Sequence, residues 1–155
     1  MTPAVSIQPY RSEYRHAFER LNREWLEAHA LLEAADLEYL QDPELRILST
    51  GGQIFFAIDG DEVVGSCAAI RESALVVELA KLAVAPLAQG RGIGRRLSES
   101  VLLFARTCGA REVVLTSNSA LVNAIRLYES LGFRHAAMPA DVRYETADVY
   151  MTLTL

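Results

Sequence analysis

Hydrophobic residues recur at helical spacing in the first third of the chain. After a short extended segment at residues 5–7, this spacing predicts a helix over residues 12–29, with Ser12 as its N-cap. The apolar face of that helix consists of Phe18, Leu21, Trp25 and Leu26. A second helical pattern covers residues 31–40, and a shorter piece at 44–48 stops before a pair of glycines.

The middle third has the pattern of short strands. Residues 54–58 form an apolar run, and an Asp-Gly hairpin turn at residues 59–62 separates it from a second run at 63–70. Another turn leads into a longer strand at residues 74–84. Three consecutive strands joined by short turns predict an antiparallel meander.

The last third returns to helical spacing after Pro86. One apolar face predicts a helix that ends at Gly109. Its members are Ile93, Leu97, Val101, Phe104 and Cys108. A buried strand at 113–115 and a helix at 120–131 follow. The inward side of that second helix is expected to hold Ala124, Leu127, Tyr128 and Leu131.

Two strands, near residues 134–137 and 149–155, complete the pattern. The order is therefore strand, two helices, three strands, helix, strand, helix and two strands. This order predicts an α/β layered fold with helices around one mixed sheet. A length of 155 residues fits a single domain that covers positions 1–155.

Composition and charge exclude several classes of protein. With 51% hydrophobic and 23% charged residues, the composition is typical of a globular protein and argues against a disordered chain or a coiled coil. A net charge of −5 argues against nucleic acid as the main partner. Charges interrupt every apolar run before about 18 residues, so no membrane span is expected. Residues 1–5 lack the features of a signal peptide, which favours a cytoplasmic protein.

The cysteines and histidines give no sign of a metal site. Cys67 and Cys108 stand in apolar surroundings and are expected to be reduced core thiols. The three histidines are scattered, without the spacing that metal ligands require. No metal is therefore expected.

A glycine-rich turn follows the strand that ends at Val84. In the segment 89–95, three glycines alternate with larger residues and lead directly into a helix. Glycines let backbone N–H groups approach a ligand, and a helix N-terminus attracts negative charge. Arg91, Arg95 and Arg96 add positive charge, so the segment predicts a phosphate or pyrophosphate site. The alternative is a tight strand-to-helix turn with a solvated basic tip. The dinucleotide fingerprint and the P-loop both fail here, which disfavours a nucleotide-binding domain of another class.

Three blocks of sequence resemble the GNAT superfamily of N-acetyltransferases. The residues Gln89-x-x-Gly92-x-Gly94 resemble its acyl-CoA signature, and residues 124–133, AIRLYESLGF, resemble its C-terminal helix motif. Residues 77–84 resemble its central strand, and the ending at 147–151 also resembles endings in the family. The resemblance implies a mixed, mostly antiparallel central sheet flanked by helices and acetyl-CoA as the cosubstrate. Dimers are frequent in the family, so a homodimer is an expectation of the resemblance.

The resemblance also implies which residues bind the cosubstrate. Backbone amides of the turn would hold the CoA pyrophosphate, and the edge of the central strand would pair with pantetheine. The turn residues are Gln89, Gly90, Arg91, Gly92, Ile93, Gly94 and Arg95, and the strand residues are Leu82, Ala83 and Val84. Many members have an asparagine where this chain has Leu121. Two nearby asparagines are therefore candidates for a side-chain contact to pantetheine, and Asn118 is favoured over Asn123.

Two residues match catalytic positions of the family. Glu78 corresponds to the residue that often serves as the base for the incoming amine, and Tyr128 would donate a proton to the leaving thiolate. An amine of pKa ~10.4 is only about 0.04% neutral at pH 7, so the reaction needs a base that removes a proton from the ammonium form. Proton transfer from an ordinary tyrosine to a thiolate of pKa ~8.5 is uphill by about 2 kcal/mol, which favours hydrogen-bond donation. The alternatives are a surface glutamate paired with a cation such as Lys81, and an ordinary helix tyrosine.

The function expected from the resemblance is acetyl transfer from acetyl-CoA to a primary amine of a small molecule, with a protein amine as the less favoured acceptor. The alternative is a non-catalytic acyl-CoA-binding module of the same fold. The first two helices and a loop at 139–144 are expected to wall the acceptor side. Its candidate residues are Glu24, Trp25, His29, Glu33 and Tyr144.

Overall fold

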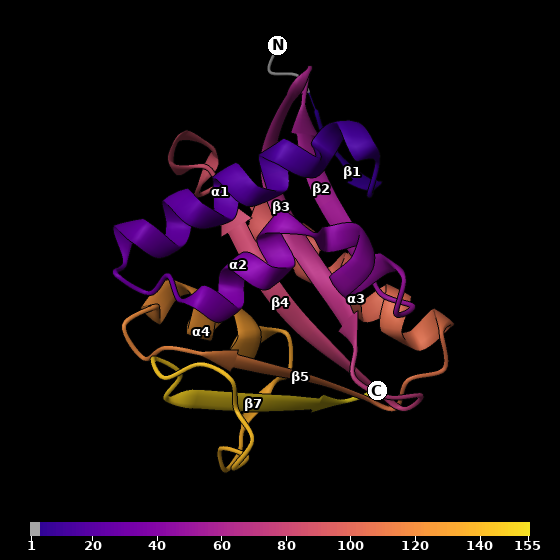
Figure 1. Cartoon of the computed structure of the whole chain (residues 1–155), viewed down its shortest axis with the longest axis vertical. Coiled ribbons are helices and arrows are strands. Elements are labelled where there is room, and N and C mark those ends of the chain that lie inside the picture. Colours follow the sequence, from indigo (N-terminus) through magenta and orange to yellow (C-terminus); the bar gives the residue numbers. More distant parts are fainter. Residues whose placement is uncertain (1–3) are drawn as a thin grey trace.

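A seven-stranded mixed sheet forms the centre of the computed structural model, which describes residues 4–155 (Figure 1). The strand order is β1-β2-β3-β4-β5-β7-β6, and every neighbouring pair is antiparallel except β4 and β5. The strands are β1 (Val5–Pro9), β2 (Gln53–Asp59), β3 (Glu62–Arg71), β4 (Val76–Val84), β5 (Glu112–Ser117), β6 (Arg134–His135) and β7 (Val149–Thr154). The predicted element order and the mixed, mostly antiparallel sheet are confirmed. The signal-peptide prediction falls mainly on residues 1–3, outside the described residues.

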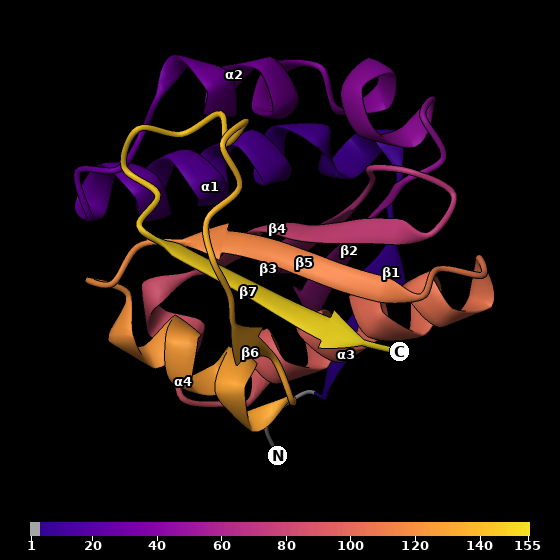
Figure 2. The ribbon, with the colours of Figure 1, turned by 90° about the horizontal axis from the view of Figure 1, so that it is seen from below.

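Helices cover both faces of this sheet (Figure 2). α1 (Arg15–Ala28) and α2 (Ala34–Gln41) lie on one face, and α3 (Ile93–Thr107) and α4 (Val122–Ser130) lie on the other. Each face has its own core, one built around Phe18, Leu40 and Phe56 and the other around Leu97, Val101 and Leu115. Short helical turns occupy Ser12–Tyr14, Glu44–Leu48 and Pro86–Ala88. Both cysteines are free thiols, as predicted.

The helix starts differ from the sequence prediction. Ser12 opens a 3₁₀ turn and makes no capping hydrogen bond, and the α-helix begins at Arg15. That turn is held instead by the Tyr14 ring, whose centroid lies 5.1 Å from that of Phe56. The second helix begins at Ala34 rather than at 31, because the Asp36 carboxylate accepts a hydrogen bond of 2.8 Å from the Glu33 N–H and fixes the first turn there.

Candidate functional site

β4 and β5 pair over only three positions and then diverge. Val76, Val77 and Glu78 face Glu112, Val113 and Val114, and no pairing between the two strands continues beyond Glu78. β4 stays paired with β3 to its end, while β5 stays paired with β7. A cleft of about 540 Å³ opens where the strands separate. Its walls come from both helical layers as well as from the two strands.

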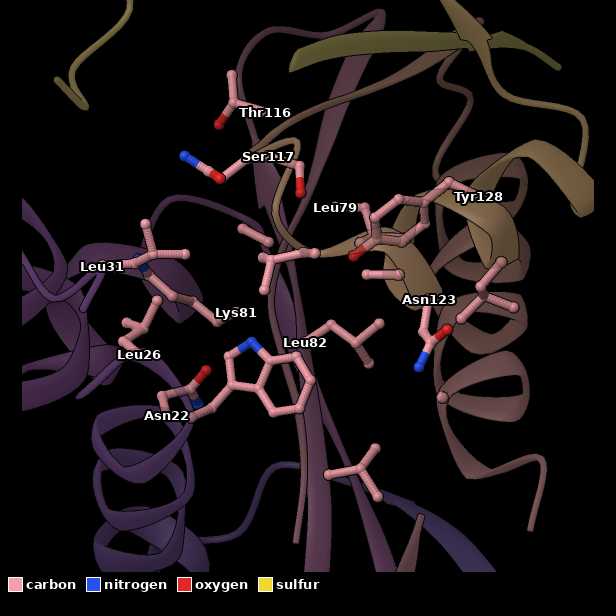
Figure 3. A pocket seen from close by; sticks show the side chains of 18 of the residues that line it. Asn22, Leu26, Leu31, Leu79, Lys81, Leu82, Thr116, Ser117, Asn123 and Tyr128 are labelled. Atoms are coloured by element: carbon pink, nitrogen blue, oxygen red, sulfur yellow. The ribbon is translucent and has the colours of Figure 1, made fainter. Parts of the chain in front are cut away.

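A bulge in β4 lies at the middle of this cleft. Ala68 of β3 pairs with Ala80 and Ser66 pairs with Ala83, so Lys81 and Leu82 together face a single residue of β3. Lys81 has a φ of 56°, which is rare for a residue with a side chain. The bulge reverses the direction of the side chains, and both Lys81 and Leu82 line the cleft (Figure 3).

The glycine-rich turn stands at one end of the cleft. Gly90 and Gly92 have φ values of 81° and 75°, and Gly92 is the residue that immediately precedes α3. A Cβ placed on either glycine would meet no atom within 4 Å, so open space lies beside both. Unpaired N–H groups at the start of a helix and this open space suit an anionic group. The residues present therefore fit a CoA diphosphate.

The two arginines of the turn have different surroundings. Arg95 lines the cleft and donates a hydrogen bond to the Ser130 hydroxyl. Arg91 forms an ion pair with Asp59 at 2.8 Å and does not line the cleft. The sequence predicted both as cosubstrate-binding residues, but the structure brings only the Arg95 side chain to the cleft.

Most other residues predicted to bind the cosubstrate are brought together. Those lining the cleft are Leu82, Val84, Gln89, Gly90, Gly92, Ile93, Gly94, Asn118 and Asn123. Ala83 does not line it, because its side chain is 1% exposed and belongs to the core beneath the strand. Gln89 donates a hydrogen bond of 3.2 Å to the Val84 carbonyl, so its side chain lies against the end of β4.

The two asparagines differ in what their amide groups contact. Asn118 donates to the Thr146 carbonyl at 2.6 Å and accepts from the Ala120 N–H at 2.9 Å, so the protein uses both ends of its amide. Asn123, in the first turn of α4, is exposed and faces the cleft (Figure 3). Asn123 is thus the asparagine with an amide available to a ligand, whereas the sequence favoured Asn118.

Glu78 lies where β4 begins to leave β5. Burial, followed by the nearby Glu72 carboxylate, raises the pKa of Glu78 to about 7, although Lys81 and Arg143 oppose the rise. No ion pair joins Glu78 to a cation within residues 4–155, which argues against the alternative of a paired surface glutamate. A carboxyl group with a pKa near neutral is suited to accept and release a proton.

Tyr128 approaches from the opposite face of the sheet. It is 7% exposed, and its ring packs edge-on against Phe133 with the centroids 5.9 Å apart. Figure 3 shows its hydroxyl directed into the cleft, close to Leu79. Burial, and to a smaller extent Cys67, raises the pKa of Tyr128 above its ordinary value. The hydroxyl therefore stays protonated near neutral pH and can donate a hydrogen bond.

A buried ion pair that the sequence did not predict borders the other half of the cleft. The Lys81 ammonium contacts the Asp36 carboxylate, and these side chains are 7% and 4% exposed. Lys81 also donates to the Tyr144 hydroxyl at 3.0 Å, and its Nζ lies 4.8 Å from the centre of that ring. Burial and Asp36 raise the pKa of Tyr144. Asp36 and Lys81 are 45 residues apart in the sequence, so no local pattern could have indicated their contact.

The loop after β6 is tied to the start of α2. The Glu33 carboxylate accepts hydrogen bonds from the Glu145 N–H at 3.0 Å, from the Thr146 N–H at 3.2 Å and from the Thr146 hydroxyl. Burial opposes ionisation, but these hydrogen bonds lower the pKa of Glu33. The loop and α2 thus form a connected roof over this half of the cleft, which we call the acceptor half.

The predicted acceptor residues divide into three groups. Trp25 and Tyr144 line the cleft, and Glu33 holds its roof. Glu24 and His29 instead line a separate cavity of about 160 Å³ between α1 and residues 84–89. His29 bonds through Nδ1 to the Trp25 carbonyl at 2.8 Å, and the two rings lie 4.6 Å apart.

Across residues 4–155, no group of three or more His, Cys, Asp or Glu side chains is arranged to hold a metal ion. In the same part of the chain, no helix combines the length and the apolar character needed to cross a bilayer.

The sequence matches the family description "Acetyltransferase (GNAT) domain" over residues 50–135. The human protein named N-acetylaspartate synthetase is 36% identical over 116 residues, which are 73% of this chain and 36% of that protein. The chain thus matches little more than a third of the length of that synthetase.

Solved structures share the architecture. A GNAT-family acetyltransferase from Staphylococcus aureus Mu50 has a TM-score of 0.87 at 19% identity, covering 97% of this chain and 99% of that one. The protein yncA from Salmonella typhimurium, solved with its cofactor acetyl-CoA, has a TM-score of 0.79 at 24% identity, covering 97% and 94%. At these identities the likeness concerns the fold.

Proposed function

The chain belongs to the GNAT acetyltransferase family, and on this basis we propose that it is an acetyl-CoA-dependent N-acetyltransferase acting on a primary amine of a small molecule. One observation carries the proposal. A single cleft between β4 and β5 is lined by the glycine-rich turn, by Glu78 and by Tyr128. It therefore combines an anion site, a base and a hydrogen-bond donor.

The half of the cleft beside α3 and α4 binds the cosubstrate. N–H groups of the turn from Gln89 to Arg95 hold the diphosphate, assisted by the Arg95 guanidinium. Beyond Glu78, the edge of β4 at Leu82 and Val84 has no partner in β5, so it is free to pair with the amide groups of pantetheine. Acetyl-CoA bound to yncA, a protein of the same fold, supports this assignment.

Glu78 provides the base. An ammonium of pKa ~10.4 must lose a proton before it can attack, and at pH 7 this costs about 4.6 kcal/mol. Glu78, with a pKa of about 7, accepts that proton directly or through water and passes it to solvent. The amine nitrogen then forms a bond to the acetyl carbon while the carbon–sulfur bond breaks. The amine nitrogen loses a second proton as the amide forms, and this proton neutralises the negative charge of the departing thiolate.

Tyr128 stabilises the leaving group. Its raised pKa makes complete proton transfer to a thiolate of pKa ~8.5 more unfavourable than it would be for an ordinary tyrosine. Tyr128 therefore donates a hydrogen bond to sulfur rather than giving up its proton outright. A backbone N–H of β4, at Leu82 or Val84, donates to the carbonyl oxygen as negative charge develops there.

The acceptor half favours a small molecule. The contacts of Glu33 with residues 145 and 146 tie the loop over this half, an arrangement that suits a small acceptor better than an extended peptide. The only charged side chains that line this half are Glu78 and the mutually neutralising pair Asp36 and Lys81, within the described residues. Their presence is compatible with a bound amine.

The test is thiol release from acetyl-CoA in the presence of amino acids, polyamines, aminoglycosides and peptides. We expect release with at least one small amine, and its loss in Glu78→Gln. If the folded protein binds acetyl-CoA but acetylates no amine in a broad panel, the proposal is refuted in favour of the non-catalytic acyl-CoA-binding module. Calorimetry with CoA distinguishes that result from an inability to bind.

A further inference from the structure

Asn22 is a buried polar residue on α1 for which the proposed mechanism has no role. It is 1% exposed, yet it contributes to the wall of the cleft. Most side chains of α1 that face the sheet are apolar, such as Phe18 and Leu21. A buried amide has to satisfy both its donors and its acceptor to avoid a cost in stability.

Two hydrogen bonds fix the orientation of the Asn22 amide. Nδ2 donates to the Phe18 carbonyl at 2.9 Å and to the Ser66 hydroxyl oxygen at 3.0 Å. A backbone carbonyl can only accept, so the atom facing Phe18 has to be the nitrogen. Both N–H groups of the amide are thereby used, and Oδ1 points away from them.

The Asn22 oxygen is left open to the cleft. No donor in residues 4–155 forms a hydrogen bond to Oδ1. Every fully buried side-chain nitrogen or oxygen among these residues has a partner, so Oδ1 must retain some exposure. Figure 3 shows this oxygen turned from α1 toward the middle of the cleft. The protein thus holds a hydrogen-bond acceptor in place for a donor that it does not itself supply.

Asn22 is close to the point at which β4 bulges. Its partner Ser66 lies 3.5 Å, oxygen to oxygen, from the Lys81 carbonyl. Ser66 faces Ala83 across the strand pair, one position beyond the bulge. Oδ1 therefore lies beside the part of β4 at which the proposed mechanism holds the thioester, on the face of the sheet that α1 covers.

We propose that Asn22 Oδ1 accepts a hydrogen bond from an N–H of the incoming amine and orients its lone pair toward the thioester carbon. This inference rests on the proposed function. A neutral primary amine has two N–H donors and one lone pair, so fixing an N–H limits the directions in which the lone pair can point. An amide oxygen is neutral and holds the amine without the strong preference of a carboxylate for the ammonium form.

The experiment compares Asn22→Leu with the wild-type protein, using the best amine from the thiol-release panel. Loss of one neutral hydrogen bond lowers kcat/KM for the amine by about three- to tenfold. The KM for acetyl-CoA and the affinity for CoA stay unchanged. The affinity of the protein–CoA complex for the amine, measured by calorimetric titration, falls by a similar factor. This gives a readout that is independent of turnover.

Two further variants separate this role from a structural one. Asn22→Ser introduces a shorter side chain and replaces Asn22→Leu in these measurements if the leucine variant does not fold. Phe18→Leu loosens the packing of the same helix at a residue that does not line the cleft, so it lowers Tm without changing either KM. Unchanged amine kinetics and binding in both Asn22 variants overturn the inference, as does a rise in the KM for acetyl-CoA alone, which would assign Oδ1 to pantetheine. Absence of wild-type turnover with every amine refutes the proposed function and this inference together.

Discussion

Replacing Glu78 with glutamine should make the protein more stable and less active. The wild-type carboxyl group has an ordinary pKa of 4.5 that burial raises to about 7. Below pH 4.5 this group is protonated in the folded and the unfolded chain alike, and glutamine differs little from it. Between pH 4.5 and 7 the unfolded chain releases the proton while the folded chain keeps it, so the stability of the wild type falls as pH rises.

The size of the effect follows from the two pKa values. A change from 4.5 to about 7 corresponds to about 3 kcal/mol at 1.36 kcal/mol per pKa unit. Glu78→Gln cannot ionise, so its free energy of unfolding should exceed that of the wild type by about 3 kcal/mol at pH 8. At pH 4 the two values should nearly coincide. Activity should fall by about a hundredfold or more, because the general base is gone.

Urea denaturation of both proteins at intervals between pH 4 and pH 8.5 measures this difference. All other titrating groups are shared, so subtracting one curve from the other isolates Glu78. The wild-type rate should also rise with pH through about 7, as Glu78 ionises. A stability difference that is constant across the pH range would show that the pKa of Glu78 is not raised and would remove the physical basis for its role as base.

Four other predictions test the remaining parts of the site. Tyr128→Phe should lower turnover about ten- to a hundredfold through loss of a hydrogen bond to a charged sulfur, with CoA affinity by calorimetry unchanged; wild-type turnover would exclude Tyr128 from the mechanism. Gly92→Ala should cost about 1–2 kcal/mol in urea unfolding, because φ is 75° there while space for a Cβ exists; a neutral effect would mean that the turn readily adopts another conformation. Lys81→Met should destabilise the protein by about 3–5 kcal/mol, since the buried Asp36 loses its partner, and an unchanged denaturation midpoint would contradict this. Arg95→Ala should weaken CoA binding in calorimetry more than Arg91→Ala, and the reverse order would contradict the placement of these side chains.

The element order could be predicted because it depends on local patterns. Alternation and helical spacing identify strands and helices from neighbouring residues, and the turn at 89–95 combines its glycines with a following helix within one short segment. The positions of Glu78 and Tyr128 could be inferred from their motifs, and the structure brings both residues to one cleft. Their chemical roles remain predictions.

The features that sequence reasoning missed depend on contacts between distant segments. In a regular strand Lys81 would share the buried face of Val77 and Leu79. The bulge turns it instead toward Asp36 on the opposite face of the sheet. Arg91 was assigned to the cosubstrate because it lies in the turn, but Asp59, 32 residues earlier, holds its side chain. Asn22 carried no recognisable motif, and its importance follows only from the two hydrogen bonds of its amide nitrogen, which leave the amide oxygen without a partner in residues 4–155.

The short junction between β4 and β5 has a mechanical consequence. Within residues 4–155, the β1–β4 part of the sheet pairs with the β5–β7–β6 part at only three facing residue pairs, all between β4 and β5. A pantetheine chain bound between β4 and β5 would contact both parts of the sheet and hold them together. A free acetyl-CoA concentration of a hundred times Kd would add about 2.7 kcal/mol to the free energy of unfolding. The stability of the folded protein would then depend on the acetyl-CoA concentration around it.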